Sequence, residues 1–484
     1  MAPADSGRLD RHSRRPARAA WLLVAAGCAL GPVPDALAQS VDGTTGSVAA
    51  TPLSAGEDTL RGPVEETAAT AAIPADDGLD VDLLPEDVGR INRAEGTVDG
   101  LRPRFGDDGS DAPGIRLGSF TLKPSLSQTV NHESRRSGGS RTSRSYLETG
   151  LKGTLTSDWS RHALSVTGEG FYQRNVAGRG ETDPRASIDA ALRLDISRDT
   201  TATLKAGYDF EREDSTDPNA ISGASVQSGI HTYSLGADIT RDFGLLRGTA
   251  GVDFERSLYG NAKLSDGSTL SLADRDRATG TLRGRIGYEI SPALIPFLEA
   301  SLGASRYDLR RDALGFERSY RTYAGRGGVE IDLGEKLRGE FALGYETVRF
   351  EDARLKDLKG LTFDSRIDWS PRRGTDLSLN LITAVEPSTT AGESGALAYT
   401  LRSGLAHELR SALVARLTNS FTFRDYPSGG TLADETVWSV GAGLTWDLNR
   451  YLALTGDVSF ERTKPSGGSA SDVARIGVGL TLRR

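Results

Sequence analysis

Apolar and polar residues alternate along most of the chain from about residue 115 to its end. In 233–239 every second residue is apolar, and a similar run begins after a break of a few residues at 241–244. Side chains of a strand point to opposite faces with a period of two residues, so each run has one apolar and one polar face. A break this short is typical of a β-hairpin. The pattern therefore predicts antiparallel strands joined in pairs.

Runs of this kind predict about eighteen strands (16–18), and the connections between them alternate between tight turns and longer loops. The first longer loop is expected at Asn131–Arg144. Short turns at one rim, longer loops at the other and an even strand count are typical of bacterial outer-membrane barrels. We therefore predict an all-β fold, a transmembrane antiparallel up-and-down β-barrel over 115–484. The expected strands are 115–130, 145–157, 161–174, 185–198, 201–213, 229–242, 245–259, 275–290, 294–308, 320–332, 336–350, 360–370, 374–386, 396–409, 411–425, 435–448, 450–462 and 471–482.

The positions of the aromatic residues favour a membrane barrel over a soluble β core. Aromatic residues gather near strand ends, as expected for two belts at the two membrane interfaces. Pro124, Pro296 and Asn419 fit the strand pattern poorly. The residues expected beside tight turns are Trp369, Trp446 and Tyr451, and those expected near loops are Tyr208, Phe254, Phe350, Phe423 and Phe460.

The first 38 residues have the order of a secretory signal peptide. Basic residues precede a short apolar stretch, Ala19–Leu30, which is too short to cross a membrane as a helix. Ala36-Leu37-Ala38 then precedes Gln39, and we expect cleavage between Ala38 and Gln39. Cys28, the only cysteine, lies inside this segment, so the mature chain would have no disulfide. Acylation of Cys28, as in a lipoprotein, is the weaker alternative.

Residues 39–114 are expected to form an acidic, disordered periplasmic linker. They contain sixteen acidic and five basic residues, and they are rich in Ala, Gly, Thr and Pro without sustained periodicity. The predicted barrel, 115–484, is nearly balanced, with 48 basic and 47 acidic residues. No basic stripe indicates nucleic-acid binding.

The polar faces of the predicted strands carry charges of both signs. They are expected either to line a water-filled lumen and set its selectivity or to pair across strands and hold the wall together. No loop after Ile115 is judged long enough to fold in as a large constriction, so any narrow point is expected from lumenal side chains or from the linker. The candidate lumen-lining residues are Arg247, Arg277, Arg283, Arg285, Arg326, Arg338, Arg366, Asp253, Glu255, Glu289, Glu330 and Glu340.

Catalytic and metal-binding patterns find little support. The mature histidines His132, His162, His231 and His407 are far apart in the sequence. No metal-ligand spacing or phosphate-binding glycine loop is present, and we expect no cofactor and no enzyme activity.

Two stretches resemble a known family. GIRLGSFTLKPSL (Gly114–Leu126) and SDWSRHALSV (Ser157–Val166) are similar to motifs that open the barrel of the putative β-barrel porin 2 family. The resemblance covers 111–484 and implies an outer-membrane barrel; some members of the family are associated with exopolysaccharide production. The end, Leu482-Arg483-Arg484, lacks the terminal aromatic residue common in such proteins.

Three hypotheses follow from the sequence. The leading one is a passive outer-membrane channel for small hydrophilic solutes, or a barrel involved in exopolysaccharide export. The second is a non-conducting structural or surface-interaction barrel, and the third is a barrel hydrolase. Expected partners are outer-membrane lipid, the barrel assembly machinery and a solute or polysaccharide, with the linker and the C-terminus in the periplasm.

Overall fold

The computed structural model describes residues 112–484, apart from residues 216, 428 and 429. The predictions of a signal peptide, of cleavage between Ala38 and Gln39 and of most of the acidic linker lie outside the described residues. Within them, eighteen long strands form one closed antiparallel sheet. These are β2 (Phe120–Ser137), β3 (Ser140–Ser157), β4 (Ala163–Gly178), β5 (Arg185–Asp195), β6 (Thr200–Arg212), β8 (Gly229–Phe243), β9 (Leu246–Tyr259), β12 (Arg277–Tyr288), β13 (Leu294–Tyr307), β14 (Tyr320–Asp332), β15 (Leu337–Phe350), β16 (Leu358–Arg372), β17 (Thr375–Pro387), β18 (Gly395–Arg410), β19 (Leu413–Asp425), β20 (Glu435–Asn449), β21 (Leu452–Pro465) and β22 (Ser471–Arg483).

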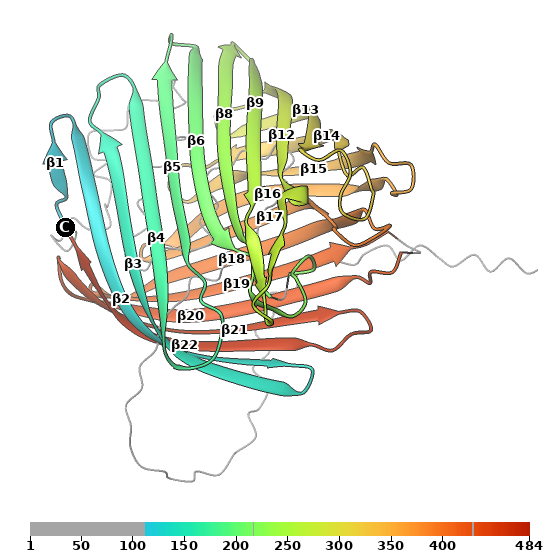
Figure 1. Cartoon of the computed structure of the whole chain (residues 1–484). Coiled ribbons are helices and arrows are strands. Elements are labelled where there is room, and N and C mark those ends of the chain that lie inside the picture. The colour runs from blue at the N-terminus through green and yellow to red at the C-terminus, as the bar shows by residue number, and fades with distance from the viewer. Residues whose placement is uncertain (1–111, 216, 428–429) are drawn as a thin grey trace, which may run out of the picture. The chain divides into compact units, whose positions relative to one another are not determined.

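Each strand of the ring pairs with its neighbours in the chain, as Figure 1 shows. The ring closes because β22 pairs antiparallel with β2, with Val130 opposite Val478. A closed ring leaves no strand edge without a neighbour, which is what a sheet surrounded by hydrocarbon requires. The prediction of an all-β barrel of about eighteen strands is therefore confirmed.

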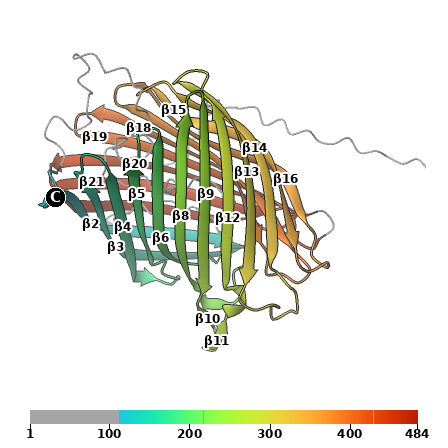
Figure 2. The same cartoon turned by 90° about the horizontal axis from the view of Figure 1, so that it is seen from above.

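The two ends of the barrel differ in their connections. At one end, here called the turn end, the connections have two to five residues. At the other, the loop end, they reach seventeen residues and contain a small sheet of β7 (Ala224–Val226), β10 (Asn261–Leu264) and β11 (Thr269–Ser271). Figure 2 shows β10 and β11 projecting beyond β8, β9 and β12. A short strand, β1 (Ile115–Leu117), pairs with the start of β2.

Helical structure is confined to one short turn in the described part of the chain. It is the 3-10 helix η3 (Ala273–Arg275), which lies between β11 and β12. No helix formed by residues 112–484, outside the three undescribed positions, is long and apolar enough to cross a membrane.

The first loop-end connection corrects the predicted alternation of short turns and long loops. The expected loop Asn131–Arg144 is wrong, because β2 and β3 continue through it to a two-residue turn at Gly138-Gly139. Both glycines have positive φ, 56° and 85°, as the tightest hairpin turns require. This segment is polar on both faces, so it lacks the alternation that marks the other strands. Its pairing is supported instead by polar contacts such as Arg144 Nη2 to Glu133 Oε2 at 3.0 Å.

Apolar side chains cover the outward face of most strands. Ile188, Leu204 and Leu343 are exposed to between 43% and 54%, while the residues that alternate with them face the inside. Trp369 and Trp446 are also exposed beside the turn end, in agreement with an aromatic belt. Phe350 is a correction, because it faces inward and packs on Tyr320 with ring centroids 5.3 Å apart.

One polar residue on the outward face is explained by its neighbour. The Trp438 Nε1–H donates a hydrogen bond to Asn419 Oδ1 at 2.9 Å. The two residues lie on the paired strands β19 and β20, so the Asn419 amide oxygen has a partner on the neighbouring strand.

The loop ends of β17 and β18 leave the regular wall. The β16–β17 ladder runs from Arg372 opposite Thr375 only to Asp364 opposite Ile382. Beyond this point, Thr383 Oγ1 contacts both the backbone N–H and the carbonyl of Phe363, at 2.9 and 3.3 Å. The β17–β18 ladder itself continues to Pro387 opposite Gly395. The hairpin therefore separates from β16 as a unit.

This hairpin end packs against the inner face of the neighbouring strands. Val385 and Leu397 form a buried cluster with Tyr320, Val348 and Leu358, which lie on the inward faces of β14, β15 and β16. A Cβ at Gly360 would lie 2.5 Å from Leu397 Cδ1, so only glycine leaves room for the leucine there. The tip of the β17–β18 hairpin is thus folded into the barrel.

Candidate functional site: the inner wall and the loop-end mouth

The inner wall of β8 to β16 carries a network of arginines and carboxylates centred on Glu299. Arg285 Nε lies 2.8 Å from Glu299 Oε2, and Arg326 Nη2 lies 2.7 Å from Glu299 Oε1. Arg326 also reaches Asp364 at 2.6 Å, and Arg285 reaches Glu340 at 2.8 Å. Bidentate guanidinium groups bridge carboxylates on different strands, so the network joins β12, β13, β14, β15 and β16.

Arg283 extends this network toward β8. Its guanidinium pairs with Asp238 at 2.5 Å and lies 4.0 Å from Glu299. Nearer the turn end, Arg247 pairs with Asp242 at 2.7 Å and lies within 4 Å of Glu289 and Glu330. The inner wall is therefore charged but internally compensated.

All twelve candidate residues lie on the inward side, but they do not form one site. The remaining candidates occupy separate positions. Arg277 donates to the Tyr259 hydroxyl at 3.1 Å, Arg338 lies 3.5 Å from Asp332, and Arg366 lies 3.7 Å from Asp368. Asp253 and Glu255 are on β9, facing β12. Their role in solute passage stays a prediction.

Three carboxylates of the network around Glu299 were missing from the candidates, namely Glu299 itself, Asp238 and Asp364. Glu299 bridges three arginines, and Asp238 holds the most buried one, Arg283. Both lie at polar positions of alternating runs, between Leu298 and Ala300 and between Ala237 and Ile239. Alternation alone could have identified them, but only the strand register brings their partners together.

The loop-end mouth is crossed by a contact between two loops from distant parts of the ring. One loop, 213–228, follows β6, and the other, 388–394, joins β17 to β18. Asn219 Nδ2 donates to the Pro387 carbonyl at 3.1 Å, and Asn219 Oδ1 accepts from the Thr389 backbone N–H at 2.9 Å. Seven strands of the ring lie between β6 and β17 on the shorter side. We call this contact the mouth bridge.

Arginines from other loops hold both sides of the mouth bridge. Arg275 donates to Glu213 Oε1 at 3.0 Å and to the Asn219 carbonyl at 2.9 Å. Arg318 donates to the carbonyls of Thr390 at 2.9 Å and Glu393 at 3.0 Å, and also to that of Ser388. Because guanidinium groups have several donors in a fixed plane, each can fix an irregular loop at several points.

The sequence predicted no single loop long enough for a large constriction and placed any narrow point at lumenal side chains or the linker, but the mouth bridge shows that two shorter loops also meet across the mouth. Loop 213–228 has sixteen residues, which is short for a constriction formed by one loop. The β17–β18 hairpin comes to meet it, because its tip is already folded inward. Loop 213–228 and the tip of the β17–β18 hairpin thus narrow the mouth together. The length of each loop alone did not predict this.

Burial changes the acidity of the loop carboxyls at the mouth. Glu213 is buried, and this burial raises its pKa to about 7 although Arg275 opposes the shift. The pKa of Asp217 is also raised by burial, against the backbone N–H of Asn219 and the charges of Arg424 and Arg275. Burial disfavours the charged form of a carboxyl. Raising the pH through 7 therefore ionises Glu213, and burial makes that charge unfavourable next to the mouth bridge.

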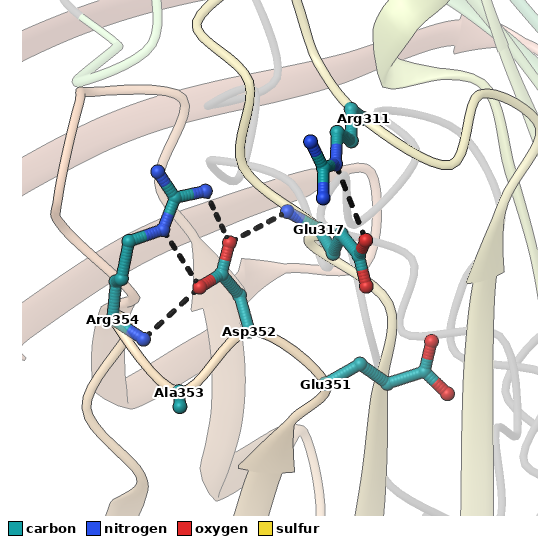
Figure 3. Close-up of a pocket in the computed structure, with 6 residues that line it drawn as sticks. All are labelled: Arg311, Glu317, Glu351, Asp352, Ala353 and Arg354. Atoms are coloured by element: carbon teal, nitrogen blue, oxygen red, sulfur yellow. Dashed lines mark hydrogen bonds and ion pairs between the residues drawn. The ribbon is translucent and has the colours of Figure 1, made fainter.

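A small polar cleft lies beside the mouth, between loops 308–319 and 351–357. Its volume is about 320 Å³, and Figure 3 shows the residues around it. Asp352 accepts hydrogen bonds from Arg354 Nε at 2.9 Å and from the Glu317 backbone N–H at 3.0 Å. These bonds hold the pKa of Asp352 well below its usual value. Arg311 pairs with Glu317 and Arg354 with Asp352 inside the cleft, whereas Glu351 pairs with Arg306 outside it, and these contacts connect the two loops.

The histidines contact hydroxyl or backbone groups in separate hairpins. His132 Nδ1 lies 3.1 Å from Ser145 Oγ, and His407 Nδ1 lies 2.9 Å from Thr375 Oγ1. His162 accepts from the Asp195 backbone N–H at 3.2 Å, and His231 contacts the Tyr208 hydroxyl. Among the residues placed in the structure, no group of three His, Cys, Asp or Glu is arranged to hold a metal ion.

The match to a family model agrees with the barrel. A family model described as putative beta-barrel porin 2 matches residues 108–484. Similar solved structures include OpdQ and OpdF (OccK2) of Pseudomonas aeruginosa and OccAB4 of Acinetobacter baumannii, at 11%, 15% and 10% identity. Each alignment covers 75% of this chain and 98% of the other, with TM-scores of 0.37, 0.38 and 0.36. A comparison with curated proteins gave no match.

Proposed function

This chain belongs to the putative β-barrel porin 2 family and is a porin-like barrel of the bacterial outer membrane, and we propose that it is a passive channel for small hydrophilic or charged solutes. The inner wall supports this proposal. Its arginines and carboxylates alternate around Glu299 and form a polar surface for water and solutes. The loop end faces outward in this proposal, and the C-terminus lies in the periplasm.

The mouth bridge favours small solutes over a polymer. A polysaccharide chain would have to pass between loops 213–228 and 388–394, which Asn219 joins by direct hydrogen bonds. In this proposal small solutes pass beside the bridge without separating the two loops. Exopolysaccharide export would require these loops to separate.

The same bridge supports a second candidate function, a barrel that does not conduct until its mouth is opened. Arg275 and Arg318 hold the two loops by several hydrogen bonds each. In this case the loops would serve as a surface for contacts outside the cell. The two candidates differ in conductance at rest.

Single-channel recording in planar lipid bilayers tests the proposal. The mature chain should give stepwise conductance, with ion selectivity that changes when Arg285 or Glu340 is replaced. Correctly folded protein that never conducts would overturn the channel proposal. Heat-modifiable migration in gels gives an independent check that the protein is folded.

A reversible crosslink separates the two candidates. The only cysteine of the chain is Cys28, in the predicted signal peptide, so Asn219→Cys with Thr389→Cys introduces a defined thiol pair. A channel with spaces beside the bridge should conduct in both redox states. A barrel closed by the bridge should conduct only after reduction. Asn219→Cys alone is the matched control.

A further inference from the structure

The outward face of β14 and β15 carries two arginines directly opposite each other near the loop end. Arg321 pairs with Arg349 in the antiparallel register. Both side chains are exposed, whereas their chain neighbours Tyr320 and Val348 are buried on the inner side. Directly opposed like charges destabilise a strand pair. Some other interaction should therefore offset this repulsion.

The neighbouring basic residues already have acidic partners. Arg256 pairs with Asp308 at 2.5 Å, and Lys359 pairs with Asp357 at 3.4 Å. Within residues 112–484, excluding the undescribed positions, neither arginine of the opposed pair makes a salt bridge. The Arg349 guanidinium lies 5.7 Å from the ring centroid of Tyr323, a neutral partner. The positive charges of Arg321 and Arg349 thus have no acidic partner among the described residues, unlike those of the neighbouring basic residues.

Below the arginines, toward the turn end, the outward surface is apolar and partly bare. Tyr323 and Tyr345 are exposed to 41% and 52%, and Leu298 on the next strand is exposed to 72%. Between them, β14 has glycines at 325 and 327 on the outward face. A Cβ at Gly325 would meet no atom within 4 Å, whereas a Cβ at Gly327 would lie 3.3 Å from Leu298 Cδ2, so a strip of backbone is open at Gly325 and bordered by Leu298.

We propose that this surface binds a membrane lipid with a phosphate-bearing headgroup. The phosphate lies between Arg321 and Arg349, and an acyl chain lies over Gly325 and against Leu298. Guanidinium groups bind phosphate oxygens in a bidentate manner, and two of them match the charge of a phosphate monoester. Tyrosines mark the level of the headgroups in membrane barrels, which places the arginines at that level. The lipid belongs to the leaflet at the loop end.

Binding of a lipid at this surface can be distinguished from binding of a free phosphate ion. A free phosphate would use the two arginines alone, whereas a lipid also uses the bare strip on β14. Replacing Gly325 by leucine fills that strip, and the open space around Gly325 leaves room for the side chain. The substitution should therefore weaken lipid binding without changing phosphate binding.

Native mass spectrometry of the mature full-length chain in detergent tests this site. The probes are phosphatidic acid, phosphatidylcholine with matched acyl chains, and inorganic phosphate. The chain should retain phosphatidic acid in preference to phosphatidylcholine. R321Q with R349Q should lower that retention by at least about tenfold, because charged hydrogen bonds are lost. Gly325→Leu should lower it severalfold.

Arg310→Gln with Arg311→Gln is the matched control, because these arginines are exposed in the adjacent loop and pair with Glu317. The control should retain phosphatidic acid as the parent chain does. Unchanged retention in R321Q with R349Q would overturn the proposal. So would equal retention of both lipids, or competition by inorganic phosphate with no effect of Gly325→Leu. Gel mobility of each variant confirms that the barrel has folded.

Discussion

The regular wall and the inward-folded end of the β17–β18 hairpin use the same antiparallel ladder but bury different faces. In the wall, apolar side chains face outward and charged ones face inward, as in β13, where Leu298 is exposed and Glu299 is buried. In the hairpin, both faces are covered, and Ile382, Thr383, Ala384 and Val385 are all buried. A strand covered on both faces has no reason to alternate.

The comparison shows that the two regions are stabilised in different ways. The inner wall near Glu299 is joined by ion pairs, whereas the hairpin is joined to β14–β16 by the apolar cluster of Leu397, Val385 and their neighbours. Four substitutions test this difference.

The largest effect on stability is expected in the wall. Arg326→Ala removes one guanidinium and leaves Glu299 and Asp364 buried with fewer partners. Breaking a buried pair from one side costs about 3–5 kcal/mol. Unfolding in detergent, followed by gel mobility, should show this loss. Arg116→Ala, which removes an exposed ion pair with Asp158 outside this network, is the control, with a change below about 0.5 kcal/mol.

A smaller loss of stability is expected in the hairpin. Leu397→Ala leaves a cavity in a buried cluster, and such changes cost about 2–4 kcal/mol. Leu298→Ala, on the exposed outward face, should cost less because it leaves no cavity. Equal costs in the same unfolding assay would mean that the hairpin packs no better than the outward face. Leu397→Ala should also increase conductance, because it loosens one side of the mouth bridge.

Asn219→Ala should change stability modestly and conductance clearly. It removes partly buried hydrogen bonds to Pro387 and Thr389, each of which contributes about 1 kcal/mol. Bilayer recordings should show larger or more frequent open steps. The same substitution at Asn449, which is exposed at the turn end as the last residue of β20, is the control. Identical recordings for Asn219→Ala and the parent chain would show that the bridge does not restrict the pore.

The smallest expected effect is a dependence of gating on pH. In the folded-in loop the pKa of Glu213 is about 7, above its usual value near 4.5. The folded-in loop therefore binds the proton on Glu213 more tightly than an open loop does. The free energy that this proton contributes to the folded-in state is lost as the pH rises from 4.5 through 7. Open steps should be more frequent at pH 8 than at pH 5. Glu213→Gln should flatten this profile, and an unchanged profile would contradict it.

The sequence predicted the strand count and the face of each candidate, but it failed at two segments for physical reasons. The first hairpin is polar on both faces, so Asn131–Arg144 looked like a loop. The β17–β18 tip has apolar residues on both faces. The sequence pattern therefore did not predict that this tip folds into the barrel. The candidate list contained most of the inner network, but it could not show that Glu299 is shared by three arginines.

By itself, the sequence determined the barrel, because alternation with a period of two assigns each side chain to one face of a strand. It also determined that one face is apolar and the other charged. Only the tertiary structure decided which charges pair, how the hairpin tip leaves the wall and where two loops meet across the mouth. These features depend on register and on contacts between segments about 170 residues apart, such as Asn219 and Thr389, which no local pattern records.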